Sequence, residues 1–266
     1  MWYPPESGCI TVEFVSALDA VALRRALLSE TDLLGEFYRT ADPAMPVPTC
    51  PGWTLSDLIA HVGAGHRWVA ALIADRSTGP YAIDQVPDAG RPNGIDATVA
   101  WLRDGARLVL AAIDAIGSDV PVWTAYGAAR PAEWWVRRRL HEVTGHRADA
   151  LLSDARPVTI DAVLAADGVA EFLSLIAMGS THFETPLDHG TSLSLHATDT
   201  DATWSVRRAT DTIVWTDGRL PATTTVRGPA VEVYLLLLRR ISADHPRLEV
   251  DGDPAVLDTW LRRTAF

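Results

Sequence analysis

The sequence contains few cysteines, and the two that it has are not arranged as a pair. Cys9 and Cys50 lie far apart among the 266 residues and form no CxxC motif. Isolated cysteines of this kind are typical of reduced thiols in the cytoplasm, where disulfides are rare. Cys50 directly precedes a Pro-Gly pair, so we expect a small residue in a turn there, with a reactive thiol as the alternative.

Long hydrophobic runs and an excess of positive charge are also missing. No stretch of about 18 uncharged apolar residues occurs, so the sequence predicts no membrane span. The first residues lack the positive start and apolar stretch of a secretion signal, and we expect a cytoplasmic protein. The net charge of -11 and the pI of about 5.1 argue against nucleic-acid binding, which requires a basic surface.

What the first half of the chain does contain is helical periodicity. Hydrophobic residues make up 48% of the sequence, enough to fill the cores of one large or two modest domains. Apolar residues recur at helical spacing in four segments, separated by proline and glycine: 17–41, 54–75, 95–117 and 131–152. Four successive long helices predict a four-helix bundle, and such bundles often hold metals between facing helices.

The pattern changes to shorter elements after Pro157. We expect a helix at 161–179 and, towards the end of the chain, an apolar helix at 231–241 and a last helix. Between and after them lie short runs that predict strands, at 191–197, 203–208, 212–216, 222–227 and 247–250. The sequence therefore predicts an α+β fold with two domains, a helical bundle at 1–156 and a small α+β domain at 157–266.

The most informative stretch is the run from His141 to His146. Glu142 and His146 are four residues apart, so they share one face of a helix and can bind one divalent metal together. The zinc-protease motif H-E-x-x-H does not fit, because its second histidine would fall on Gly145. His141 and His146 are about 140° apart around the helix and cannot share an ion.

A third ligand has to come from another segment, and His61 is the best candidate. It lies beside the apolar stripe of the 54–75 helix. By position alone, a lone histidine there is more often a structural core or surface residue than a ligand. His66, five residues further on, points elsewhere.

A polar stripe follows the 131–152 helix. Trp135, Arg139, Glu142, His146 and Asp149 fall on one face, where a plain amphipathic helix would carry Leu or Val. We interpret this face as lining a site, with a solvent-facing surface as the alternative. Asp149 could orient a ligand imidazole, and Arg139 could bind an anionic group or simply be a surface cation.

Two segments, 47–62 and 135–150, resemble the mycothiol-dependent maleylpyruvate isomerase family. They carry the patterns G-W-[ST]-x-x-[DH]-L-x-x-H and H-E-x-x-x-H-R-x-D, and the resemblance extends over nearly the whole chain. It implies a DinB-like metal-binding four-helix bundle with a smaller α+β domain, and metal ligands at His61, Glu142 and His146. The family's Gly-Arg pair corresponds here to Arg239 and Arg240, at the end of the 231–241 helix. Arg240 would be the arginine that reaches the active-site cleft in some members, although an arginine at a helix end also suits the helix dipole.

The resemblance implies a thiol-dependent enzyme. A metal with three protein ligands keeps an open position, and a thiol bound there is deprotonated near neutral pH. The thiol would be mycothiol, the small thiol of actinobacteria, and it would add to a small electrophilic substrate in an isomerisation or an S-transfer. Zinc is the first choice of metal, while nickel, iron and cobalt also suit these ligands. We expect a monomer or homodimer.

Three other functions stay open at this stage. The same site could use metal-bound water, which would make the protein a hydrolase or lyase. It could also belong to a metal-containing binding or regulatory protein without turnover, or to a bundle that has lost its metal.

Overall fold

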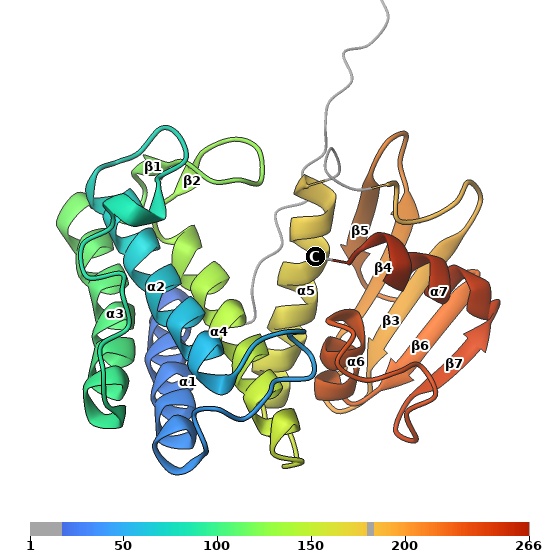
Figure 1. Ribbon diagram of the computed structural model, residues 1–266. Helices are drawn as coiled ribbons and strands as arrows, with labels where there is room; N and C mark the ends of the chain where they lie inside the picture. The colour runs from blue at the N-terminus through green and yellow to red at the C-terminus, as the bar shows by residue number, and fades with distance from the viewer. Residues whose placement is uncertain (1–17, 180–183, 266) are drawn as a thin grey trace, which may run out of the picture.

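The computed structural model describes residues 18–179 and 184–265, so Cys9 lies outside the described part of the chain. The described residues form a helical bundle beside a mixed sheet that carries its own helices (Figure 1). Each part has its own apolar core. The predicted α+β architecture is confirmed, whereas the domain boundary at residues 156/157 stays a prediction.

Four long helices build the bundle: α1 (Ala20–Thr40), α2 (Leu55–Ala74), α3 (Ile95–Ile116) and α4 (Trp134–Ser153). They begin where the sequence supplies caps. The Asp19 side chain accepts from the N–H of Ala22 at the start of α1, and Thr54 with Asp57 forms a capping box at the start of α2. The predicted bundle is confirmed.

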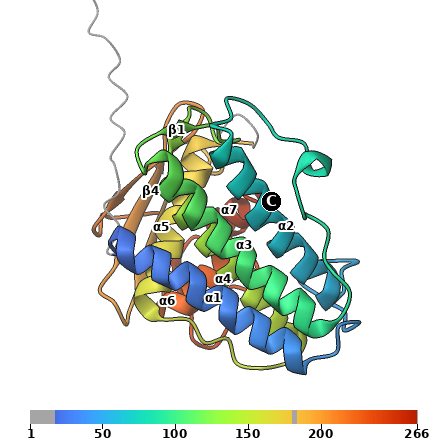
Figure 2. The same ribbon diagram turned by 90° about the vertical axis from the view of Figure 1, so that its left-hand side faces the viewer.

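The bundle closes over an apolar interior. Its core includes fully buried side chains from all four helices, among them Leu27, Leu58, Leu102 and Val136. Figure 2 shows the bundle from outside, with α1 and α3 nearest the viewer. Between the helices lie the short helix η1 (Ile83–Gln85) and a two-stranded sheet. Its strands are β1 (Pro121–Val122) and β2 (Arg130–Pro131). Helix α4 lies on the side of the bundle next to the second part of the molecule, where it contacts α5 (Figure 1).

The second part is a five-stranded sheet with three helices. The strands lie in the order β5-β4-β3-β6-β7, with β3 and β6 parallel and every other pair antiparallel. Their bounds are β3 (Ser192–Ala197), β4 (Thr203–Arg208), β5 (Ile213–Asp217), β6 (Thr224–Gly228) and β7 (Glu249–Gly252). The helices are α5 (Ala162–Met178), α6 (Ala230–Leu237) and α7 (Pro254–Arg263).

Helix α5 joins the two parts. Leu164, in its first turn, belongs to the bundle core, whereas Val169 and Phe172 belong to the core under the sheet. In Figure 1, α5 and α6 stand between the bundle and the sheet, and α7 lies across the sheet in front. Side chains of α5 and α6 contact α4, as in the Arg137–Asp167 pair and the bond from the Tyr234 hydroxyl to the His141 carbonyl. A site between the two parts can therefore draw residues from both.

Helix α6 ends earlier than the sequence predicts. It stops at Leu237 rather than near residue 241, because Arg239 adopts the left-handed conformation, with φ 61°. The N–H of Arg240 bonds the carbonyl of Leu235, and the N–H of Arg239 bonds that of Leu236, which is the Schellman arrangement. Arg240 therefore follows the helix instead of ending it. The residue in the left-handed conformation is usually glycine, which accounts physically for a Gly-Arg pair at this place.

No helix within residues 18–179 and 184–265 is both long and apolar enough to cross a membrane.

Candidate metal centre in a cleft between the two parts

A cavity of about 580 Å³ lies where the bundle meets the second part. The loop before α2 contributes Cys50 and Trp53 to its wall, α5 contributes Phe172, and the end of α6 contributes Arg240. The three residues predicted as metal ligands line it as well, from α2 and α4. Its size is within the usual range for small-molecule sites.

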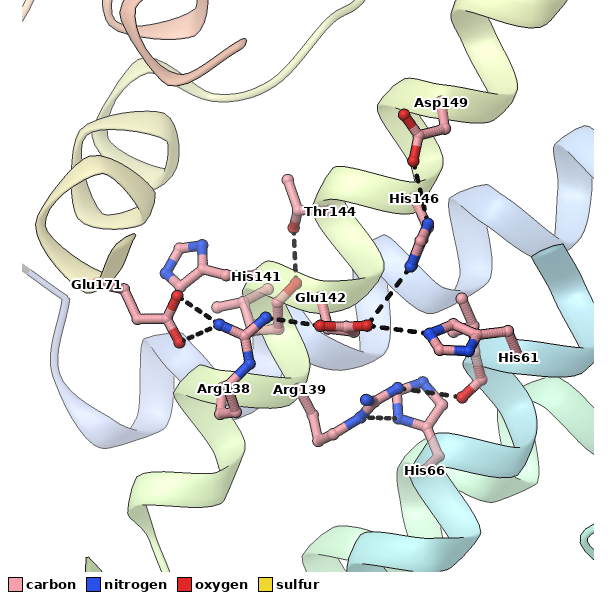
Figure 3. A network of polar contacts seen from close by, with 12 residues as sticks. His61, His66, Arg138, Arg139, His141, Glu142, Thr144, His146, Asp149 and Glu171 are labelled. Atoms are coloured by element: carbon pink, nitrogen blue, oxygen red, sulfur yellow. Dashed lines mark hydrogen bonds and ion pairs between the residues drawn. The ribbon is translucent and has the colours of Figure 1, made fainter. Parts of the chain in front are cut away.

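The three predicted ligands lie together. The Nε2 atom of His61 is 3.1 Å from Oε1 of Glu142, and Nε2 of His146 is 3.4 Å from the same oxygen. Donor atoms of all three lie within 4.8 Å of one another. Figure 3 shows Glu142 between the two imidazoles, which reach it from α2 and α4.

The apolar pattern of α2 determines where His61 lies. Leu58, Ile59 and Val62 are fully buried in the bundle, so their helix must turn the neighbouring His61 towards the rim. The His61 side chain is 43% exposed. The Trp53 ring packs near both imidazoles, with centroids 4.9 Å from His61 and 6.1 Å from His146.

The spacing of the donors fits a metal. Four ligands at about 2.1 Å around a tetrahedral zinc are separated from one another by about 3.4 Å, from the geometry of the tetrahedron. The two imidazole nitrogens lie 3.1 and 3.4 Å from Oε1 of Glu142, close to this value. Two imidazoles and a carboxylate also match the ligand types that zinc accepts. The residues present therefore fit a divalent metal.

Behind His146 lies a buried acid–base chain. Its Nδ1 atom is 3.0 Å from Oδ2 of Asp149, which leaves Nε2 facing Glu142 and His61. The Asp149 carboxylate, with no exposed side-chain surface, accepts two bonds from Arg240, from Nε at 2.7 Å and from Nη2 at 2.9 Å. Arg240 thus lines the cavity, and its role in catalysis stays a prediction.

The electrostatics of this group follow from its contacts. Burial raises the pKa of Glu142, but His146, His61 and Arg138 outweigh burial and hold it well below its ordinary value. Burial lowers the pKa of His146, but Asp149, Cys50 and Glu142 raise it well above its ordinary value. Burial likewise raises the pKa of Asp149, whereas its bonds to His146 and Arg240 depress it strongly. Both carboxylates are therefore ionised at neutral pH.

Cys50 lies closer to this group than its position in the sequence indicates. Its Sγ atom is 3.5 Å from Oδ2 of Asp149, and Cys50, His146 and Asp149 form a second group of possible metal donors within 4.8 Å. Asp149 is already paired with the guanidinium of Arg240, which opposes a second cation there. The loop before α2 therefore brings a thiol to the cavity wall.

Three residues considered in the sequence analysis, Arg139, His66 and His141, bond partners outside the donor group. Arg139 was predicted to bind an anionic group. Among the described residues that line the cavity, however, Arg138 is present and Arg139 is not. The Arg139 guanidinium lies inside the bundle, donating to Nδ1 of His66 at 3.2 Å and to the carbonyl of Val62 at 3.1 Å. His141 turns to Asp167 on α5, at 2.6 Å. His66 and His141 belong to neither group of possible metal donors among the described residues, although His141 lines the cavity.

Sequence reasoning did not identify Arg138 or Glu171. Arg138 bonds Glu142 at 2.6 Å and Glu171 at 2.6 and 2.7 Å. Its place four residues before Glu142 was a usable signal, because residues at this spacing meet on a helix. Glu171 lies in α5, a mostly apolar helix of the second part, and no sequence pattern around it linked it to Glu142.

Two family models match the chain. The mycothiol maleylpyruvate isomerase N-terminal domain matches residues 24–151, and the MDMPI C-terminal domain matches residues 163–259. The chain belongs to the mycothiol maleylpyruvate isomerase family. The two models together span most of the bundle and most of the second part, so membership covers both halves of the site.

Solved structures agree on the fold. The crystal structure of the mycothiol-dependent maleylpyruvate isomerase is similar with a TM-score of 0.58 and 17% identity, covering 90% of this chain and 97% of that one. A histidine-to-alanine variant of it gives the same TM-score and identity over 84% and 90%. At this identity the likeness shows a common fold. No curated protein matches the chain in sequence.

Proposed function

We propose that this protein is a metalloenzyme that uses mycothiol. A divalent metal at His61, Glu142 and His146 would activate the thiol for addition to a small electrophilic substrate, in an isomerisation or an S-transfer. The observation that supports this most is the convergence of three donor atoms within 4.8 Å on the wall of a 580 Å³ cavity. Family membership supports mycothiol as the thiol.

Zinc is the metal we propose, because two imidazoles and one carboxylate suit it. When bound, it would lower the pKa of a thiol at its open position, so that thiolate is present near neutral pH. A neighbouring carboxylate would orient one of the ligands. Asp149 accepts at Nδ1 of His146 and fixes the ring with Nε2 towards the metal position.

Arg240 is the residue we propose for the substrate. A guanidinium has five N–H donors, and the bonds to Asp149 and to the Leu238 carbonyl use three of them. Two N–H groups are left for a carboxylate. Because Asp149 holds the side chain in the cavity, a substrate carboxylate would be bound at a fixed distance from the activated sulfur.

The walls of the cavity suit a small unsaturated acid. Phe172, Leu175 and Trp53 supply apolar surface to the cavity, and Glu142 and Arg240 are among its polar groups. In an isomerisation the sulfur would form a bond to one carbon of a double bond, the molecule would rotate about the resulting single bond, and the same carbon–sulfur bond would break. No atom is gained or lost.

The direct test is turnover of maleylpyruvate by the zinc-loaded protein with and without mycothiol. We expect conversion of the cis to the trans double bond only when both metal and thiol are present. The rate should level off near neutral pH, below the free thiol pKa of about 8.5.

A Cys9→Ala/Cys50→Ala double variant separates an external thiol from the chain's own. We expect it to retain metal and thiol-dependent turnover. Turnover that needs no added thiol would favour a hydrolase or lyase using metal-bound water, and turnover lost with Cys50 would overturn the role of mycothiol.

A further inference from the structure

Arg138 connects a predicted metal ligand to the second part of the molecule. Its Nη2 atom donates to Oε2 of Glu142 at 2.6 Å, and its Nη1 atom donates to both oxygens of Glu171 on α5, at 2.6 and 2.7 Å. Figure 3 shows the guanidinium between the two carboxylates. The Arg138 side chain is 14% exposed and that of Glu171 is 6% exposed.

The two oxygens of Glu142 have different partners. Oε1 faces His61 and His146, whereas Oε2 is bonded to Arg138. A free carboxylate can bind a metal through one oxygen or through both. Here one oxygen is held by a charge-assisted bond and is turned away from the imidazoles.

Glu171 keeps Arg138 in this position. Without it, a long guanidinium side chain would be free to turn along the cavity wall, since arginine has many rotamers. The bidentate contact to a buried carboxylate on another helix fixes its direction. The three side chains together carry one negative charge, so the cluster still attracts a cation.

We propose that Arg138, anchored by Glu171, is a positioning residue that limits Glu142 to one-oxygen ligation. The second oxygen would otherwise occupy a further coordination position of the metal. Arg138 thereby keeps that position free on the cavity side for the thiol. This inference rests on the metal site of the proposed function.

A neighbouring ion pair makes it possible to distinguish positioning of Glu142 from a purely structural link between α4 and α5. Arg137 bonds Asp167 at 2.8 Å, also between α4 and α5. It is adjacent to Arg138, and its acid partner lies one helical turn before Glu171. An Arg137→Met variant is therefore a matched control for the loss of one arginine between these helices.

The experiment compares cobalt-loaded wild-type, Arg138→Met and Arg137→Met proteins by visible absorption, then titrates each with mycothiol. Cobalt absorbs less strongly as its coordination number rises. We expect weaker bands and an about 10–100-fold weaker thiol affinity in Arg138→Met, the range typical of residues that support a ligand. Arg137→Met should match the wild type in both.

The outcomes are distinct. Identical bands and thiol affinity in Arg138→Met and wild type would overturn the inference and leave the metal site intact. Equal changes in both variants would show a structural role only and would also overturn it. If wild-type protein takes up no cobalt, the proposed function fails with it. Should Arg138→Met not fold, an Arg138→Met/Glu171→Gln protein, which leaves no unpaired carboxylate at 171, is judged by the same criteria.

Discussion

Helices α2 and α4 bring a histidine and a charged residue together twice, with opposite results. At the cavity, His61 meets the carboxylate of Glu142 at 3.1 Å. Inside the bundle, His66 meets the guanidinium of Arg139 at 3.2 Å. We call these the open pair and the closed pair. The residue types are similar and the helices are the same, but only the open pair has a negative partner and a route to solvent.

The sign of the partner charge decides what each pair can bind. In the open pair, His61 and Glu142 together with the imidazole of His146 offer three donor atoms to a cation. In the closed pair a resident cation already occupies the space beside the imidazole. Burial lowers the pKa of Arg139 to about 10, so it is still charged at neutral pH. Of these two histidines, we therefore propose only His61, which lies beside a negative charge, as a metal ligand.

The largest effect should come from exchanging the histidines for alanine in turn. We expect His61→Ala to weaken zinc affinity by more than the about 10–100-fold typical of residues that only support a ligand. His66→Ala should retain about one zinc per chain, because its ring contacts Arg139 and not the donor group. Metal content after dialysis against a weak chelator measures both. Equal losses of metal from the two variants would contradict the proposal that only the open pair binds the metal.

The contrast between the pairs also marks how far sequence reasoning reaches. The four helices, the strands and the donor trio follow from periodicity, capping residues and the family motifs. The place of Arg139 does not. Its helix offset put it on the stripe with Glu142, but the side chain is long enough to turn into the bundle, where His66 and the Val62 carbonyl accept its bonds.

The end of α6 shows a second limit. The apolar pattern continues beyond Leu237, so the sequence predicts a longer helix than the structure has. Nothing in the sequence marks the true end, because arginine rarely adopts the left-handed φ of 61° found at Arg239. Contacts between distant segments, such as Arg138 with Glu171, depend on how the two parts pack. No local pattern contains that information.

The next largest effect should come from Gly65→Ala, which tests how tightly the Arg139 guanidinium of the closed pair is packed. A Cβ at Gly65 would lie 2.9 Å from both Nη atoms of Arg139, so Gly65→Ala should push the guanidinium off its acceptors. Overpacking costs about 1–3 kcal/mol, and alanine returns up to about 1 kcal/mol of helix propensity. We expect a net loss of about 1 kcal/mol in the free energy of unfolding, measured with urea, at unchanged metal content. A more stable protein would contradict the packing.

Arg139→Met should change how the closed pair responds to acid. Burial, and then the charge of Arg139, lowers the pKa of His66 well below 6.5. The unfolded chain therefore takes up a proton below about pH 6.5 that the folded chain does not, so stability is present above that pH and is lost as pH falls. Without Arg139 the pKa of His66 should rise.

The measurement is the free energy of unfolding between about pH 6.5 and 5. One proton accounts for at most about 1.4 kcal/mol per pH unit, and we expect Arg139→Met to reduce the slope by part of that amount, since burial persists. A His66→Ala protein, which lacks the titrating ring, is the control. A steeper slope in Arg139→Met would contradict the account.

The smallest effect, and the sharpest comparison, comes from placing the same methyl group on the open side. Gly145 lies in α4 at the cavity wall, between Glu142 and His146. A Cβ there would meet Leu238 Cδ1 at 3.5 Å and the Tyr234 hydroxyl at 3.8 Å, which are ordinary contacts. Gly145→Ala should therefore keep its gain in helix propensity, about 0.5–1 kcal/mol, and raise Tm. Because Gly65→Ala gains the same propensity, the difference between the two variants isolates packing. Opposite signs are expected, and equal changes would mean that the open side is as tightly filled as the closed one.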